Sequence, residues 1–485
     1  MNKIQVPHDY RLLSLPDLIS SRRDFLVAAL SGLLLGLLFF WIGPILTLAI
    51  LTVLVFVFVI FKAPEFVILI MLVFASGLLP QNWNRSFDLF VGHFQLTDLI
   101  LVALLCLTIF RAITERDFKL RKTPLNLPIA LFSGVVFLGI GTAVVKHGVK
   151  FSYATYEARI LLYYTLFFAV INLIRTRQQI YRLIYGIFAI GIFIALTLIL
   201  QVMLGFSFPS VFETYFKSDL LARAYHPGLI AVYMTIMALI CLLVFPRPLS
   251  QVVMIWIALF VLGLGNSVSL GRNIVISTLF SLFLLLFLLN ESQRKHWLQN
   301  ILALALFAIA VFSLLKMITP TAAILDYPEA LVERFTHFFE TDALSPDETV
   351  LWRVEEIGFA WEKIEASPIL GIGFRTYYRP PFSETDTLQS FIHNGYLWLW
   401  LKTGFFGLVL FLWIMAIFLV RGIRGWSKNP DRFLSATSLS FVLVILAMLI
   451  SDFVAPLLVS DFNLAFFATG MGIVESIAAL KQDSG

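Results

Sequence analysis

The sequence has little charge and almost no cysteine. Charged residues make up 13% of its 485 positions, hydrophobic residues make up 60%, and the mean hydropathy is +0.91. A soluble protein of this length needs far more polar surface, so these values exclude that class and indicate a multi-pass membrane protein. The two cysteines, Cys106 and Cys241, both lie inside apolar runs and provide neither a disulfide framework nor a metal-binding spacing.

Two further absences narrow the function. The net charge of +5 does not indicate a nucleic-acid partner, because the basic residues fall in short loops between apolar runs. No cleavable signal peptide is evident, since the first apolar run begins near Phe25, lacks a small-residue cleavage site and continues into a second run.

The apolar runs predict an all-α integral membrane protein with about 12–14 transmembrane helices. Backbone polar groups cannot remain unpaired in lipid, so runs of this length should be helices. The predicted spans are residues 25–42, 44–61, 64–79, 96–112, 126–145, 159–175, 183–204, 227–245, 250–266, 273–290, 298–316, 394–420, 433–450 and 456–479.

The basic loops predict the orientation of this bundle. Counted from a cytoplasmic N-terminus, the four most basic short loops fall on one side of the membrane, and they are residues 111–122, 175–182, 291–295 and 421–432. Because short cytoplasmic loops carry an excess of lysine and arginine, we expect that side and both termini to be cytoplasmic.

One hydrophilic loop, residues 317–392, separates the transmembrane helices of residues 1–316 from those of residues 393–485. Residues 319–392 contain 13 acidic and 5 basic side chains, and the span count places them on the outer side. Helical spacing predicts an amphipathic helix that ends at Ser367-Pro368 and lies on the membrane or over the bundle. Its predicted apolar stripe is Val350, Val354, Ile357, Trp361 and Ile364, with Glu355, Glu356 and Glu362 facing away.

Basic side chains and one histidine gather on the predicted outer face. His393 lies where the large loop re-enters the membrane, and three arginines can reach the same face: Arg223, Arg272 and Arg353. A single histidine or arginine at a helix end usually has an interfacial or capping role. Arg272, however, interrupts a long apolar stretch, where charge is expensive and usually functional. Arginines bind phosphate bidentately and histidine can accept a proton near neutral pH, which together favour chemistry on a phosphorylated lipid without a metal ion.

The region around His393 resembles the bacterial O-antigen ligase and polymerase superfamily. The pattern H-[NSQ]-x9-G-x-x-[GTY] is matched completely by His393-Asn394, Gly404 and Gly407. Upstream, "RVEEIGFAWEKIEASPILGIGF" (353–374) is similar to the family's Arg…Trp…Pro-x-x-Gly-x-Gly segment, and "RAYHPGLIA" (223–231) to its Arg…His-Pro segment. "SLGRN" (269–273) lies where the family usually has Ser-Arg-Gly, with a different order.

The resemblance implies a GT-C-like inverting glycosyltransferase of the bacterial inner membrane with a periplasmic active site. It implies no cofactor and no metal. The donor would be an undecaprenyl-pyrophosphate-linked glycan, and the acceptor lipid A-core or a growing glycan, both among membrane lipids. By the same resemblance, His393 would be the general base, supported by Asn394. Arg223 and Arg272 would bind the pyrophosphate, with Arg353 as a third candidate.

Four functions remain compatible with these residues. An O-antigen ligase is favoured because the ligase pattern is complete, and an O-antigen or exopolysaccharide polymerase of the same superfamily is the alternative. A protein O-oligosaccharyltransferase would use a different hydroxyl acceptor. A lipid-linked oligosaccharide flippase would suit the number of spans, but such transporters usually carry paired halves and charges near the midplane, which are not evident in this sequence.

Overall fold

The computed structural model describes residues 61–79, 92–205, 222–340, 348–382, 388–459 and 461–480, together with Asn84, residues 87–89 and 212–215, Asp386 and parts of 43–60. The chain divides into two compact units, Met1–Ala63 and Pro64–Gly485, and every element below belongs to the second unit. The predicted span 25–42 lies outside the described residues, and 44–61 is described only in part.

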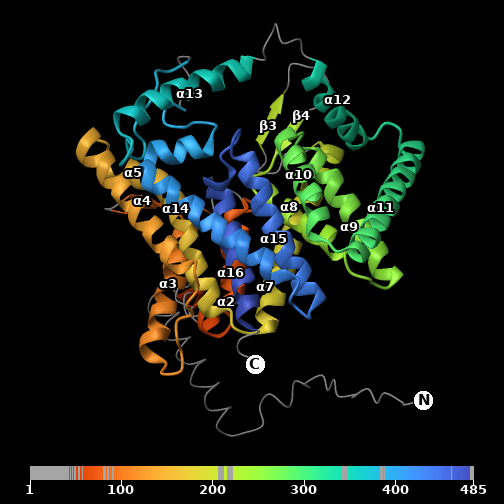
Figure 1. Ribbon diagram of the computed structural model, residues 1–485, viewed down its shortest axis with the longest axis horizontal. Helices are drawn as coiled ribbons and strands as arrows, with labels where there is room; N and C mark the ends of the chain where they lie inside the picture. The colour runs from red at the N-terminus through yellow and green to blue at the C-terminus, as the bar shows by residue number, and fades with distance from the viewer. Residues whose placement is uncertain are drawn as a thin grey trace. The chain divides into compact units, whose positions relative to one another are not determined.

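Helices build almost all of the second unit (Figure 1). In chain order they are α2 (Pro64–Ala75), α3 (Leu96–Thr114), α4 (Asn126–His147), α5 (Phe151–Leu162), α6 (Leu166–Leu173), α7 (Arg177–Leu204), α8 (Leu229–Leu242), α9 (Leu249–Ser267), α10 (Arg272–Leu288), α11 (Glu291–Ile318), α12 (Tyr327–Glu340), α13 (Glu348–Ala366), α14 (Gly395–Trp426), α15 (Arg432–Ser451) and α16 (Asp461–Leu480). Short 3-10 turns at Tyr163–Thr165, Ala323–Leu325 and Leu457–Val459 join some of them.

Two antiparallel hairpins add to the helices and depart from the all-α prediction. Strands β1 (Phe87–Leu89) and β2 (Gly92–Phe94) precede α3, whereas β3 (Phe212–Tyr215) and β4 (Ala222–Tyr225) precede α8. Each pairs only three or four residues per strand, which is too short to give a hydropathy pattern.

The helices are those of a multi-pass membrane protein. Among the described residues, nine helical segments are long and apolar enough to span a membrane, and three shorter apolar helices accompany them: Pro64–Ala75, Leu229–Leu242 and Val275–Leu288. These twelve correspond to the twelve predicted spans from 64–79 onward. The apolar stretch 250–290 is divided into α9 and α10 by the turn at residues 268–271, as the two predicted spans 250–266 and 273–290 require.

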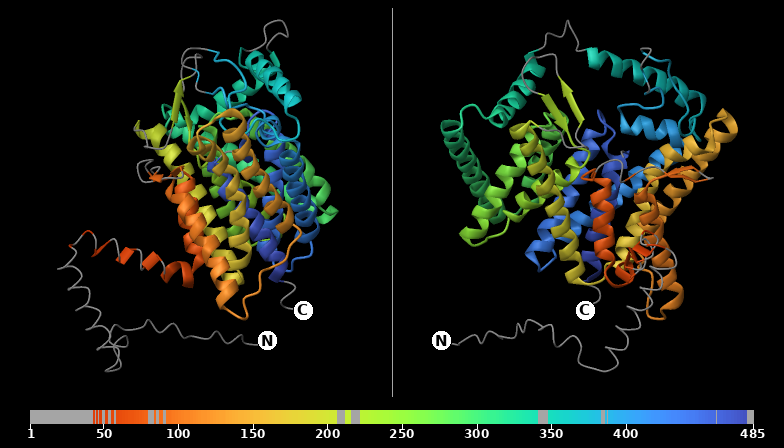
Figure 2. Two further views of the ribbon diagram at one scale, coloured as in Figure 1. Left: turned by 90° about the vertical axis from the view of Figure 1, so that its left-hand side faces the viewer. Right: turned by 180° about the vertical axis from the view of Figure 1, so that it is seen from behind.

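Burial separates central helices from peripheral ones. The spanning windows of α15 and α16 are 78% and 83% buried, whereas that of α11 is 0% buried. A helix that is apolar all round can pack against protein or face lipid, so hydropathy alone does not distinguish these positions. Figure 2 shows the long helices of this unit running side by side, with α11 at its margin.

Hydrogen bonds join the basic loops at one end of the bundle. The Arg175 guanidinium donates to Lys119 O at 2.7 Å, which links the loops after α3 and α6. Arg177 pairs with Asp431, which links the start of α7 to the loop after α14. These bonds place three of the four predicted basic loops, residues 111–122, 175–182 and 421–432, at the same end of the bundle.

The opposite end is covered by α12 and α13, which lie at the top of Figure 1. Helix α14 starts under this cover and ends near the basic loops. Its 32 residues would extend about 48 Å if straight, which exceeds the thickness of a hydrocarbon core of about 30 Å. The two ends of α14 therefore mark the two faces of the bundle.

Helix α13 packs inward through a different row of side chains from its predicted apolar stripe. The row that packs inward is Glu356, Ala360 and Ile364, at spacings of four residues, and all three are buried. Most of the predicted apolar stripe is exposed instead, with Val354 at 62% and Trp361 at 45%. The sequence left open whether this helix lies on the membrane or over the bundle, and an exposed apolar stripe is typical of an amphipathic helix at a membrane surface.

Candidate functional site

His393 lies immediately before α14, at the end of the bundle that α12 and α13 cover. Asn394 is the N-cap of α14, and its Oδ1 accepts a hydrogen bond from Leu397 N at 3.0 Å. The Asn394 Nδ2 donates to Phe453 O at 3.2 Å. Asn394 therefore fixes where the helix begins and ties this turn to the end of α15, and it supports His393 through the backbone.

A buried carboxylate holds the His393 ring. His393 Nδ1 lies 2.8 Å from Glu356 Oε2, and the His393 backbone N–H donates to the same oxygen at 3.3 Å. The Glu356 side chain is 4% exposed, whereas the His393 side chain is 37% exposed. Since a carboxylate accepts hydrogen bonds, the neutral ring in this contact has its proton on Nδ1, and its Nε2 lone pair is then available to an incoming group. Phe391 contacts the ring edge to face, with 5.3 Å between centroids.

Glu356 is in turn held by Arg379. The guanidinium Nη2 lies 3.7 Å from Glu356 Oε1, and Nη1 donates to Asp386 Oδ2 at 2.5 Å. The Arg379 side chain is 2% exposed. Asp386 also accepts the backbone N–H groups of Phe382 and Leu388. Together, these hydrogen bonds hold the pKa of Asp386 well below its ordinary value, with the Arg379 bond as the largest cause.

The segment between α13 and α14 is pinned to α14 at a kink. Gly404 has φ +72°, and a Cβ added there would lie 1.9 Å from Ile369 O, so only glycine fits. Phe405 N, just after the kink, donates to Pro368 O at 2.9 Å. Gly404 therefore packs against the backbone of this segment.

A buried lysine anchors the same segment from below. Lys402 is fully buried, and its Nζ donates to Thr376 O at 3.0 Å while lying 3.6 Å from Glu157 Oε2 on α5. Glu157 also accepts the backbone N–H of Arg375. A buried lysine needs such partners because an unpaired charge in the interior is strongly unfavourable. The histidine segment is therefore tied to α5 and α14 together.

The strand that carries Arg223 is hydrogen-bonded to the turn that precedes Arg272. Arg223 lies on β4 opposite Thr214, and Arg272 is the first residue of α10. Ala224 N, next to Arg223, donates to Val268 O at 3.4 Å in the turn that precedes α10. The side chains of both arginines lie outside the described part of the structure.

Hydrogen bonds connect α10, which begins at Arg272, to the start of α14, which follows His393, through the end of α15. Ser277, one and a half turns into α10, hydrogen-bonds Ser451 at the end of α15 with 2.8 Å between the hydroxyl oxygens. Asp452 follows Ser451, and its carbonyl oxygen accepts from Gly395 N at 2.8 Å. The start of α10 and the start of α14 therefore lie on either side of the end of α15, on one face of the bundle.

Arg353, the third predicted arginine, is an exposed residue of α13. It precedes Glu356 by three residues, which places it about one turn away on the same helix. It thus lies near the His393–Glu356 pair, on a different element from Arg223 and Arg272.

Sequence reasoning missed Glu356 and Arg379. Glu356 was predicted to face away from the apolar stripe, yet it is 3% exposed. One signal was present: Glu356 heads the i, i+4, i+8 row with Ala360 and Ile364. No local pattern points to Arg379, because its partners Glu356 and Asp386 come from segments on either side of it.

The contact between His393 and Glu356 is an arrangement suited to proton transfer. A partly exposed histidine that is oriented by a buried carboxylate has the usual geometry of a general base. Backbone positions for two arginines lie on the same face of the bundle. The His393 end also lies opposite the basic loops.

Comparison with known families agrees with this part of the chain. Residues 253–412 match the family model described as O-antigen ligase. The matched region runs from within α9 into α14 and includes Arg272, Arg353, Glu356 and His393, whereas Arg223 lies before it. A comparison with curated proteins finds no match.

Proposed function

We propose, from the place of residues 253–412 in the O-antigen ligase and polymerase superfamily, that this chain transfers a polysaccharide from undecaprenyl pyrophosphate to a hydroxyl of lipid A-core. Members of the superfamily are membrane glycosyltransferase-like enzymes. The observation that carries the assignment is the 2.8 Å contact between His393 Nδ1 and Glu356, with the His393 side chain 37% exposed.

The proposed reaction uses His393 as the general base. Nε2 takes the proton of the acceptor hydroxyl as its oxygen attacks the anomeric carbon of the donor sugar. The bond from that carbon to the pyrophosphate oxygen breaks, and the electron pair leaves with the pyrophosphate, so the configuration inverts. Glu356 stabilises the imidazolium as it forms, in the way that a buried carboxylate assists histidine in hydrolases.

Arg223 and Arg272 are proposed to bind the leaving pyrophosphate, with Arg353 as a third contact. Arginine stays charged at every relevant pH and offers two parallel donors to phosphate oxygens. The backbone link between β4 and the turn before α10 supports a shared role for Arg223 and Arg272. The position of Arg353 one turn from Glu356 supports a contact nearer the sugar.

The proposed location is the bacterial inner membrane, with this site on the periplasmic face and both termini in the cytoplasm. The basic loops support this location, because hydrogen bonds hold them together at the end of α14 that lies opposite His393. The pyrophosphate-linked donor already carries the driving force, so the proposed reaction requires no nucleotide in the periplasm.

The test uses purified full-length chain in detergent with an undecaprenyl-pyrophosphate-linked glycan, either with lipid A-core or without added acceptor. We expect glycan to appear on lipid A-core, and we expect His393→Ala to lower the rate by about 10²–10⁴-fold, the usual contribution of a general base. His296→Ala is the matched control, because His296 is a partly buried histidine at the start of α11.

The outcomes separate the functions. A ladder of longer lipid-linked chains in the absence of lipid A-core would identify a polymerase instead of a ligase. Wild-type rates in His393→Ala would overturn the role of His393. Folded protein that transfers to neither acceptor would favour the flippase or a protein acceptor.

A further inference from the structure

An exposed tryptophan lies one turn from Glu356 on α13. Trp352 is 48% exposed, although tryptophan is among the side chains that gain most from burial. It precedes Glu356 by four residues, so both side chains lie on the same side of the helix, about 6 Å apart along its axis. Because Glu356 contacts His393, the Trp352 indole is close to the proposed general base.

The indole is held by a stack of side chains. The Phe382 ring packs against Trp352 with 5.9 Å between centroids and 25° between planes. The Arg379 guanidinium lies 4.0 Å from the centroid of the Phe382 ring, and it also pairs with Glu356. This series of contacts therefore runs from the exposed indole to the partly exposed histidine.

Phe382 is also fixed through its backbone. Its N–H donates to Asp386 Oδ2 at 3.0 Å, and the same carboxylate binds Arg379. Since Arg379 is 2% exposed, one end of the stack is inside the protein, whereas the Trp352 ring at the other end is accessible. A flat ring that is fixed in advance loses little conformational freedom when a ligand stacks on it.

Trp352 does not belong to the exposed apolar stripe of α13. It lies nine residues before Trp361, which is about two and a half turns, so these two tryptophans are on opposite sides of the helix. Lys363 is eleven residues after Trp352, about three turns away on the same side, and its side chain is 43% exposed. The indole is therefore on a polar side of the helix, which a partner reaches from water rather than from lipid.

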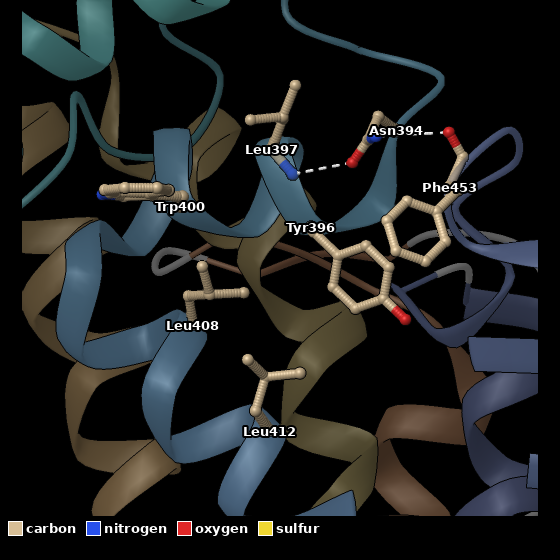
Figure 3. Close-up of a pocket in the computed structure, with 7 residues that line it drawn as sticks. All are labelled: Asn394, Tyr396, Leu397, Trp400, Leu408, Leu412 and Phe453. Atoms are coloured by element: carbon tan, nitrogen blue, oxygen red, sulfur yellow. Dashed lines mark hydrogen bonds between the residues drawn. The ribbon is translucent and has the colours of Figure 1, made fainter. Parts of the chain in front are cut away.

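The side that carries Trp361 has apolar surroundings. The Trp361 ring meets Trp400 of α14 edge to face, with 5.7 Å between centroids. Trp400 in turn lines a largely apolar groove along α14 together with leucine side chains, as Figure 3 shows for Leu397, Leu408 and Leu412. Trp361 is 45% exposed, close to the value for Trp352, so the two sides of one helix offer a matched comparison.

A pyranose ring has the chemistry that suits the Trp352 side. Its hydroxyl groups project around the ring edge and stay hydrated, whereas one face presents C–H groups that pack against the negative face of an aromatic ring. An acyl chain would instead favour the apolar side of the helix. A glycan also extends over several rings, so one ring can lie on the indole while another lies at His393.

We propose that the exposed face of Trp352 is a saccharide subsite, on which one pyranose ring stacks while a neighbouring residue reacts at His393. The inference rests on the proposed function for the nature of the substrate, whereas the stack of side chains is independent of it. The ring belongs to the donor glycan or to the core oligosaccharide of the acceptor, which share this chemistry. Stacking positions the reacting residue and takes no part in proton transfer.

Binding is measured with saccharides that carry no lipid. The probes are the core oligosaccharide released from lipid A-core and the glycan released from its undecaprenyl carrier, each added to the full chain in detergent. Saturation-transfer difference NMR reports which C–H groups lie against the protein, and thermal unfolding verifies that each variant is folded. We expect one probe to bind through one face of a ring, and that probe identifies the source of the sugar.

Trp352→Ala should weaken this binding about tenfold, because it removes the stacking surface. Trp352→Tyr keeps a flat ring and should retain most of the affinity, whereas Trp352→Leu should lose it as Trp352→Ala does. Trp361→Ala is the matched control and should bind as the wild type does. Wild-type binding by Trp352→Ala, an equal loss in Trp361→Ala, or failure of both saccharides to bind the wild type would overturn the proposal.

The transfer assay separates this inference from the proposed reaction. Trp352→Ala should raise KM for the same substrate about tenfold and leave kcat within about twofold of the wild type, as expected for lost binding. His393→Ala should bind the saccharide as the wild type does while losing transfer. If His393→Ala transfers normally, the proposed reaction fails, and the subsite is still decided by the binding of the Trp352 variants.

Discussion

Two buried carboxylates, Asp98 and Glu356, differ in the side chains that surround them. Asp98, in the first turn of α3, accepts from Arg159 Nη1 at 2.8 Å and from the Tyr163 hydroxyl at 2.7 Å. Glu356 lies near Arg379 and contacts His393. Arg159 is 9% exposed, whereas His393 is 37% exposed. Both carboxylates are well buried, and they differ in whether the partner side chain is accessible.

The largest expected effect is on stability at Asp98. Asp98→Asn removes the charge that compensates buried Arg159, and breaking a buried pair in this way costs about 3–5 kcal/mol of unfolding free energy. The thermal midpoint of the purified protein should fall strongly, and transfer should fall only in proportion to the folded fraction.

Asp117→Asn is the control for this prediction, because Asp117 is exposed in the loop after α3 and should change stability by less than about 0.5 kcal/mol. An Asp98→Asn variant with a normal midpoint but a reduced rate per folded molecule would contradict the structural role of Asp98.

The next effect is on turnover at Glu356. Glu356→Gln keeps the shape of the side chain but removes the charge that we propose stabilises the imidazolium. We expect kcat to fall about 100-fold with KM nearly unchanged, and the thermal midpoint to stay close to that of the wild type, because Arg379 keeps Asp386 as a partner.

Glu355→Gln alters the neighbouring exposed carboxylate and should leave both kinetic constants unchanged. Equal losses in the two variants, or a loss in KM alone, would show that Glu356 does not position His393 for proton transfer.

The smallest effect concerns pH and Asp386. The pKa of Asp386 is held low in the folded protein, so its stabilising contribution is complete above the ordinary carboxyl pKa of about 3.9 and is lost as pH falls through the folded value. The difference in thermal midpoint between wild type and Asp386→Asn should therefore be constant near neutral pH and shrink below about pH 4.

Glu365→Gln, an exposed change on α13, should show no such dependence. A midpoint difference for Asp386→Asn that persists at the lowest pH at which the protein stays folded would mean that the Arg379 contact does not depend on the charge of Asp386.

The sequence predicted the spans well because hydropathy reports directly on the solvent that a helix meets. Residues 250–266 and 273–290 were separated correctly even though one short turn divides them. The prediction that His393 lies beside the membrane also needed only one observation, namely where the apolar span after it begins. The site itself depends on non-local contacts: Glu356 lies 37 residues from His393, and no periodicity encodes which buried carboxylate meets which histidine.

The hairpins and the kink were missed for related reasons. Strands of three or four residues carry too little pattern, and Gly404 within an apolar run resembles any glycine of a helix–helix contact. The buried row of α13 was missed because lipid and protein interior attract the same side chains, so hydrophobic spacing indicates a face but not its partner.

Both ends of the segment of residues 368–394 are attached to helix α14. Pro368 O receives Phe405 N, and Asn394 caps the start of α14, so the intervening chain closes into a ring. The entropy of closing a flexible ring grows only with the logarithm of its length, and doubling the length adds only about 0.6 kcal/mol. Related chains can therefore lengthen or shorten the outer part of this ring over evolution while the histidine at its base keeps its place.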